Sequence, residues 1–222
     1  MNRRDFVISA LTAAGVPLPS RISGQTKAVE FDLSTLAGGK GLKVFNRSVS
    51  SFSDGTRRGL RLDATRGEGV AYLEGVEFAN GSIELDIRGK DVREQSFVGV
   101  AFHGVDETTY DAVYFRPFNF RAEDPVRRGH AVQYISSPIY KWQKLRTEHS
   151  GKYENAVNPV PDPNGWFHAR VVVASPKVSV FVEDAKEPSL VVNQLSERRK
   201  GLTGLWVDNF GGDFANFKII PT

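Results

Sequence analysis

The chain has 222 residues and a formal net charge of +3, and 40% of its residues are hydrophobic. This composition is typical of a folded globular protein and excludes wholesale disorder. Lys and Arg are scattered among Asp and Glu, which disfavours a nucleic-acid partner, and the absence of Cys excludes thiol nucleophiles, thiolate metal sites and disulfides.

The N-terminus has the layout of an export signal. Arg3 and Arg4 form a charged start, an apolar run from Phe6 to Val16 follows, and small residues with Pro come next. This run is shorter than the ~20 residues that a bilayer span needs, so we expect a signal peptide and no integral membrane span. The paired arginines resemble the twin-arginine signal, and an ordinary secretory signal is the alternative. We therefore predict that residues 1–27 are signal and linker, that export machinery is a partner, and that the protein is periplasmic or secreted.

Residues 28–222 are predicted to form one β-sandwich domain. Short runs of alternating apolar and polar residues are separated by Gly, Pro, Asn and Asp, and no helical apolar stripe occurs outside the signal. The predicted strands are Gly59–Leu62, Gly69–Tyr72, Gly81–Arg88, Ser96–His103, Ala112–Phe115, Ala131–Ile135, Trp166–Ala174, Ser179–Val182, Leu202–Asp208 and Phe214–Ile219. This succession predicts an all-β fold, a sandwich of two antiparallel sheets.

The strand Gly81–Arg88 carries two candidate catalytic acids. Its apolar residues should face the core, so Glu84, Asp86 and Arg88 face the other way. Carboxylates two positions apart on one strand face lie ~6.6 Å from each other, a separation that an inverting pair of acids can use. The simpler interpretation is a solvated sheet face on which Arg88 balances the acids.

A second candidate cluster comes from later strands. Small residues in Ser96–His103 leave room above one sheet face, and His103 stands at the end of that face. Tyr114 and Arg116 share a face, and Gln133 lies on a subsequent strand. If these strands are neighbours, the four polar residues line one hollow. Aromatic faces and planar donors favour sugar recognition, and His103 could serve as general acid or base; a satisfied polar seam is the alternative.

The segment Ser136–Gly165 has no convincing strand but is rich in aromatic and charged residues, including Trp142, Arg146 and Glu148. Long loops in compact domains are usually functional or disordered, and the aromatic content disfavours disorder. We expect an ordered loop that walls one side of a groove, with Trp142 as the best candidate for stacking on a sugar.

Metal and cofactor sites find little support. Asp208, Asn209 and Asp213 could offer oxygen ligands to Ca²⁺, but their spacing matches no defined loop, and turn chemistry explains them equally well. The Gly-x-Ser-x-Gly elbow, the His-Glu-x-x-His motif, the phosphate-binding loop and the dinucleotide fingerprint are all missing. We therefore predict neither a metal nor a cofactor.

Several motifs between about Phe78 and Pro221 together resemble a known family. They are Ile83–Arg88, Val98–His103, Val113–Arg116, Val132-Gln133-Tyr134, Trp166, Gly204-Leu205-Trp206 and Phe214–Ile219. The stretch resembles the 3-keto-disaccharide hydrolase-like family, which is related in fold to laminin-G domains and family 16 glycoside hydrolases. This resemblance implies a concanavalin A-like jelly roll, a concave sugar-facing sheet and a bacterial extracytoplasmic role in glycan use.

The acidic motif of family 16 enzymes is only partly present. Those enzymes carry the pattern acid, x, acid, x, x, acid on one strand. Glu84 and Asp86 match its first two positions, but the third falls on Gly89. The proton donor of that pattern is therefore absent here, which puts a standard retaining mechanism in doubt.

Two functions compete at this point, and a structural protein without a ligand is a third option. The first is a glycoside-processing hydrolase or lyase with His103, Glu84 and Asp86 as catalytic residues. Its substrate would be bound by Tyr114, Arg116, Gln133, Trp142, Arg146 and Glu148. The second is a non-catalytic carbohydrate-binding or surface interaction module of laminin-G type, which the incomplete acid pattern favours.

Overall fold

The computed structural model describes residues 27–55 and 57–222. The predicted export signal falls on residues 1–26, outside the described part of the chain. None of the helices in the described residues is long and apolar enough to cross a membrane.

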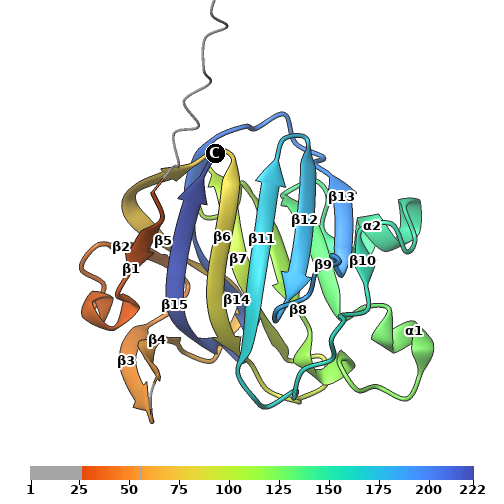
Figure 1. Ribbon diagram of the computed structural model, residues 1–222, viewed down its shortest axis with the longest axis horizontal. Helices are drawn as coiled ribbons and strands as arrows, with labels where there is room; N and C mark the ends of the chain where they lie inside the picture. The colour runs from red at the N-terminus through yellow and green to blue at the C-terminus, as the bar shows by residue number, and fades with distance from the viewer. Residues whose placement is uncertain (1–26, 56) are drawn as a thin grey trace, which may run out of the picture.

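Two antiparallel sheets pack face to face, as predicted (Figure 1). In order, the eight-stranded sheet contains β13 (Leu190–Asn193), β12 (Lys177–Val182), β11 (Phe167–Ala174), β6 (Gly81–Arg88), β15 (Gly212–Pro221), β4 (Arg57–Leu62) and β3 (Val49–Asp54), with β1 (Val29–Phe31) also paired to β15. The seven-stranded sheet contains β10 (Glu154–Asn155), β9 (Val132–Ser137), β8 (Tyr110–Phe115), β7 (Ser96–Gly104), β14 (Gly201–Asn209), β5 (Thr65–Phe78) and β2 (Leu42–Phe45). The short helices are η1 (Leu33–Leu36), η2 (Pro117–Asn119), α1 (Pro125–Arg128) and α2 (Trp142–Glu148).

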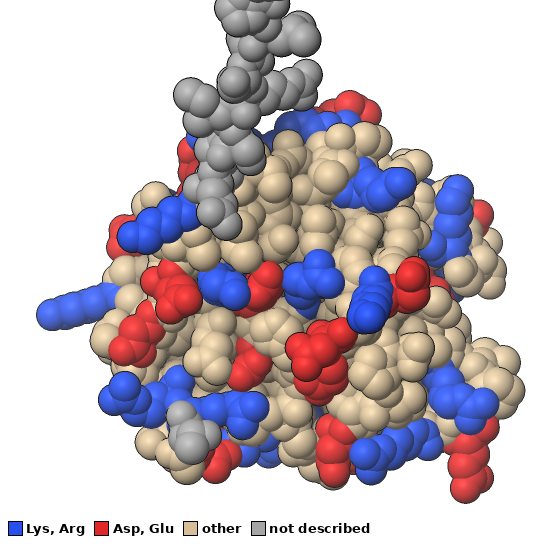
Figure 2. All heavy atoms as spheres, viewed as in Figure 1, with Lys and Arg blue, Asp and Glu red and all other residues tan. Residues whose placement is uncertain are grey.

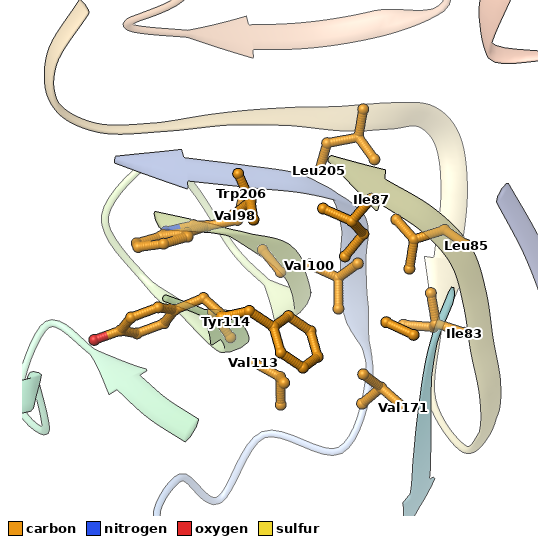
Figure 3. Packing of buried hydrophobic residues seen from close by; sticks show 14 of the residues in the cluster. Ile83, Leu85, Ile87, Val98, Val100, Val113, Tyr114, Val171, Leu205 and Trp206 are labelled. Carbon is orange, nitrogen blue, oxygen red and sulfur yellow. The ribbon is translucent and has the colours of Figure 1, made fainter. Parts of the chain in front are cut away.

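The core lies between the inner faces of the two sheets. Ile83, Leu85 and Ile87 of β6 are completely buried, and Val98 and Val100 of β7 are buried on the facing sheet (Figure 3). Their period-two spacing puts every apolar side chain of a strand on one face, and burying that face supplies the main driving force for folding.

The strands that alternation did not predict share one property: each lies at a sheet edge or pairs with a single neighbour. They are β1, β2, β3, β10 and β13. An edge strand is paired on one side only, so the core imposes a weaker apolar pattern on its sequence. Each of the ten predicted runs, in contrast, falls on a strand, with bounds that differ by a few residues.

Both described ends of the chain meet on the eight-stranded sheet. β1 pairs with β15 through Val29 and Ile219, and the end of β15 pairs with the start of β6 through Pro221 and Gly81 (Figure 1). The opposite end of β15, at Gly212, adjoins the turn that follows β14.

Gly99 allows two aromatic rings to cover the outer face of the seven-stranded sheet. Its neighbours across the sheet are Tyr114 on β8 and Trp206 on β14. Because Gly99 has no side chain, these rings stack above it with centroids 4.7 Å apart, on the side of the sheet away from the core (Figure 3). The room predicted above the small residues is therefore filled by aromatic side chains.

Replacing Gly99 by Ala should destabilise the fold. An added Cβ would lie far too close to the neighbouring backbone, with Val113 O at 2.1 Å and Tyr114 Cα at 2.6 Å. We expect Gly99→Ala to lower the free energy of unfolding by about 2–3 kcal/mol, as overpacking does in tight cores. Urea unfolding followed by tryptophan fluorescence measures this. Gly129→Ala, where the nearest atom is 3.3 Å away, is the control, and equal midpoints for the two variants would contradict the prediction.

Candidate functional site

A pocket of about 380 Å³ opens on the outer face of the seven-stranded sheet. Its floor comes from β7, β14 and the end of β8, while η2, α1 and α2 supply its walls. The lining residues are Arg93, Glu94, Phe97, Arg116, Phe118, Asn119, Arg127, His130, Trp142, Arg146, Asp208 and Asn209. The volume lies within the ~300–1,000 Å³ range of small-ligand pockets.

Three residues of the predicted polar cluster do meet. Tyr114 and Gln133 are direct neighbours across β8 and β9, and Arg116 follows β8 on the same face. The Arg116 guanidinium donates to the Tyr114 hydroxyl at 2.7 Å and to Gln133 Oε1, while the hydroxyl donates to Gln133 Oε1 at 3.1 Å. Burial raises the pKa of Tyr114 to about 12, so this phenol stays protonated and keeps donating. Of the three, only Arg116 reaches the pocket lining.

Glu154 holds the helical wall against the sheet. Its carboxylate accepts hydrogen bonds from two nitrogen atoms of Arg146 of α2, with Nε at 3.0 and 3.2 Å from its two oxygens and Nη2 at 2.9 Å from one of them. Arg116 Nη1 is 3.6 Å from this carboxylate, and His130 Nδ1 is 2.9 Å from it. Only 3% of the Glu154 side chain is exposed, so its charge and those of the two arginines interact with little screening by water.

Trp142 supplies an exposed aromatic surface at the pocket wall. It is the first residue of α2 and is 42% exposed, and the Arg146 guanidinium lies 5.0 Å from its ring centroid. The indole can stack on the flat face of a ligand ring. The N–H groups of the neighbouring guanidinium can donate hydrogen bonds to oxygen atoms on the same ligand. The segment predicted as a wall-forming loop thus contributes to the pocket, as a helix followed by the short strand β10.

Two oxygen atoms in the lining lack partners. Asn119 Oδ1 and Asp208 Oδ1 are both buried and accept no hydrogen bond from any of the described residues. Burial raises the pKa of Asp208, and the negative charge of Glu68, its neighbour across β14 and β5, adds to this shift. Buried polar atoms are normally satisfied, so these oxygens favour a ligand that supplies donors.

His103 does not join the predicted cluster. Between the pairs Gly204–Ala101 and Leu202–Gly104, β7 contains one residue more than β14, which is a β-bulge. His103 sits in this bulge with φ of 50° and is fully buried, with Nε2 2.7 Å from Ala79 O. The bulge breaks the alternation, so His103 lies apart from the pocket and does not line it.

Glu84 and Asp86 occupy the outer face of the other sheet, where oppositely charged side chains are interspersed (Figure 2). Lys218 Nζ lies 2.7 Å from Glu84, while His168 Nδ1 and Asn216 Nδ2 lie 2.9 and 2.8 Å from Asp86. Burial opposes ionisation of Asp86, but the contacts with His168 and Asn216 keep its pKa below the usual value. Glu84 and Asp86 therefore fit the simpler interpretation, a sheet face on which opposite charges balance each other. The hydrophobic core separates these two acids from the pocket.

The remaining predicted residues also lie outside the pocket. Glu148 pairs with Lys144 on the exposed side of α2. Asp213 lies on β15 of the eight-stranded sheet, whereas Asp208 lies on β14 of the other sheet. Asp213 accepts hydrogen bonds from Arg61 and Arg88. Two further hollows, of about 560 and 600 Å³, open over the eight-stranded sheet. In the first, Asp213 accepts these hydrogen bonds from Arg61 and Arg88, and in the second, Asp86 accepts one from Asn216.

Several lining residues had no signal in the sequence. Asn119, Arg127 and His130 fall between β8 and β9, in a segment of short helical turns that has no regular period. Asp208 did carry a signal, because it shares a strand face with Trp206.

Comparisons with known proteins establish the fold. No protein-family model matches the chain, and no curated protein matches it. The carbohydrate-binding module CBM66 from Bacillus subtilis is similar in structure, with a TM-score of 0.58 and 14% identity over 81% of this chain and 95% of that one. A galectin-like protein of unknown function from Bacillus subtilis has a TM-score of 0.54 and 12% identity, over 88% and 98% of the two chains. Domain 4 of AbnA, an extracellular GH43 arabinanase of Geobacillus stearothermophilus solved with arabinotriose, has a TM-score of 0.50 and 12% identity, over 88% and 91%.

At these identities the likeness shows the fold alone, and the chain is a concanavalin A-like jelly-roll sandwich. The resemblance to the 3-keto-disaccharide hydrolase-like family stays a prediction.

Replacing Glu154 by Gln should destabilise the protein. The change removes the carboxylate beside two arginines, one of which, Arg116, is 4% exposed. Breaking a buried charge pair in this way typically costs about 3 kcal/mol of unfolding free energy, measured by urea denaturation. Glu148→Gln, which breaks an exposed pair, is the control and should cost less than about 0.5 kcal/mol. Similar losses in both variants would show that Glu154 has no special role.

Proposed function

We propose that this protein binds a carbohydrate in the pocket formed by η2, α1, α2 and the outer face of the seven-stranded sheet. One observation carries the proposal: the exposed ring of Trp142 lines the same pocket as the unpartnered oxygens of Asn119 and Asp208. A sugar has faces of C–H groups that stack on an indole, and its hydroxyls donate as well as accept.

The neighbouring structures support this proposal through what their names state. CBM66 is named as a carbohydrate-binding module, and the AbnA domain was solved with a sugar, arabinotriose. Binding also suits the placement of the predicted acids. Glu84, Asp86 and His103 lie away from the pocket, so the catalytic set expected from the sequence is not assembled there.

Trp142→Ala should weaken sugar binding at least tenfold, because the stacking surface is lost while the polar groups remain. A glycan array identifies the bound sugars, and isothermal titration calorimetry then measures their affinity. Val160→Ala, which trims another exposed apolar side chain outside the lining, is the control. Absence of binding to every glycan by the folded wild-type protein would overturn the proposal.

Glycoside hydrolysis in the same pocket is a second candidate, and Asp208 favours it. Burial raises its pKa, and its unpartnered oxygen lies in the lining. A protonated carboxyl at this position can donate its proton to the leaving oxygen as the glycosidic C–O bond breaks. Water then bonds to the anomeric carbon and returns one proton to the carboxylate, so that the acid is restored.

If the protein is a hydrolase, Asp208→Asn should lower kcat by a factor of about 100 or more. The same variant should retain sugar binding, since the amide keeps the shape of the side chain. Product formation is followed by chromatography of the digested glycan. Glu148→Gln alters an exposed carboxyl outside the lining and serves as the control. Binding without product in the wild-type protein would leave recognition as the function.

A further inference from the structure

The pocket lining is rich in arginine. Four guanidinium groups line it, from Arg93, Arg116, Arg127 and Arg146, against the two carboxyl groups of Glu94 and Asp208. The four arginines come from four separate segments: the loop after β6, the end of β8, α1 and α2. Guanidinium groups are well suited to carboxylates and other planar or tetrahedral anions, which they bind through paired N–H donors.

Three of these arginines already have carboxylate neighbours. Arg116 and Arg146 share Glu154 beneath the lining, and Arg93 lies 3.3 Å from the adjacent Glu94 on the exposed rim.

Arg127 is different. It forms no ion pair with any of the described residues, and its one side-chain hydrogen bond runs from Nη2 to Phe118 O at 3.2 Å. A guanidinium has five N–H donors, so Arg127 keeps most of its donors for a ligand.

The two acidic residues in the lining repel an anion less strongly than two fully ionised, buried carboxylates would. Burial raises the pKa of Asp208, so this carboxyl is less ionised than an ordinary aspartate at a given pH. Glu94 is largely exposed, where water and salt screen its charge.

We infer that the carbohydrate of this pocket carries an anionic group, either a carboxylate or a sulfate ester, which Arg127 binds from α1. The inference rests on the proposed function and narrows its substrate class to acidic sugars. Trp142 would stack on the sugar ring, and Arg127 would pair with the charged substituent.

The test uses matched neutral, carboxylated and sulfated forms of the same oligosaccharides, first on an array and then by calorimetry at low and high salt. We expect the folded wild-type protein to bind an acidic form at least tenfold more tightly than its neutral counterpart. Because surface charges are screened by salt, this preference should shrink as the salt concentration rises. Comparing the affinities for the carboxylated and the sulfated oligosaccharides shows which anionic group the protein prefers.

Arg127→Gln should bring the ratio of acidic to neutral affinity close to one. Arg128→Gln is the matched control, because Arg128 is next in the chain, donates to Ala122 O and Glu123 O, and is outside the lining. Equal wild-type affinity for neutral and acidic forms would overturn the inference but leave carbohydrate binding standing, whereas failure to bind any glycan would overturn both. An acidic preference that survives Arg127→Gln would overturn the assignment to Arg127.

Discussion

A single buried carboxylate joins the parts of the molecule that form the pocket. Glu154 lies on β10, a strand of two residues at the sheet edge. It contacts Arg116, which follows β8, Arg146 from α2 and His130 from the segment between β8 and β9. Without this negative charge, two guanidinium groups would stand together over the sheet with no compensation. The ion pair between Glu154 and Arg146 thus joins α2, which carries Trp142, to the edge of the sheet, and the buried Leu145 adds an apolar anchor.

The two sheets use their outer faces differently. On the eight-stranded sheet, acidic side chains pair with basic or amide groups of the same surface, as at Asp86 and Asp213. On the seven-stranded sheet, the stacked rings of Tyr114 and Trp206 fill the centre of the face. This displaces the pocket toward the ends of β7 and β14, where the helical turns can build walls around it.

Much of the fold follows from period-two alternation, and so does part of the site. Alternation placed Tyr114, Arg116 and Gln133 on one face because β8 and β9 are regular neighbouring strands. It failed for His103 because an extra residue in β7 forms a bulge, which turns the side chain away from its expected face. Nor could it foresee Arg127, because residues in irregular turns are positioned by tertiary contacts rather than by a repeating pattern.

The pairing of β1 with β15 determines where the two described ends of the chain lie relative to the pocket. Both described ends lie at one end of β15, whereas the turn near Asn209, which lines the pocket, adjoins its other end. Ten residues of strand separate these points, a span of ~30 Å. A tether attached at either end would therefore join the molecule ~30 Å from this part of the pocket lining. If the pocket binds a carbohydrate as proposed, copies anchored side by side on a surface would bind a polymeric ligand at several points, and avidity would strengthen a weak individual affinity.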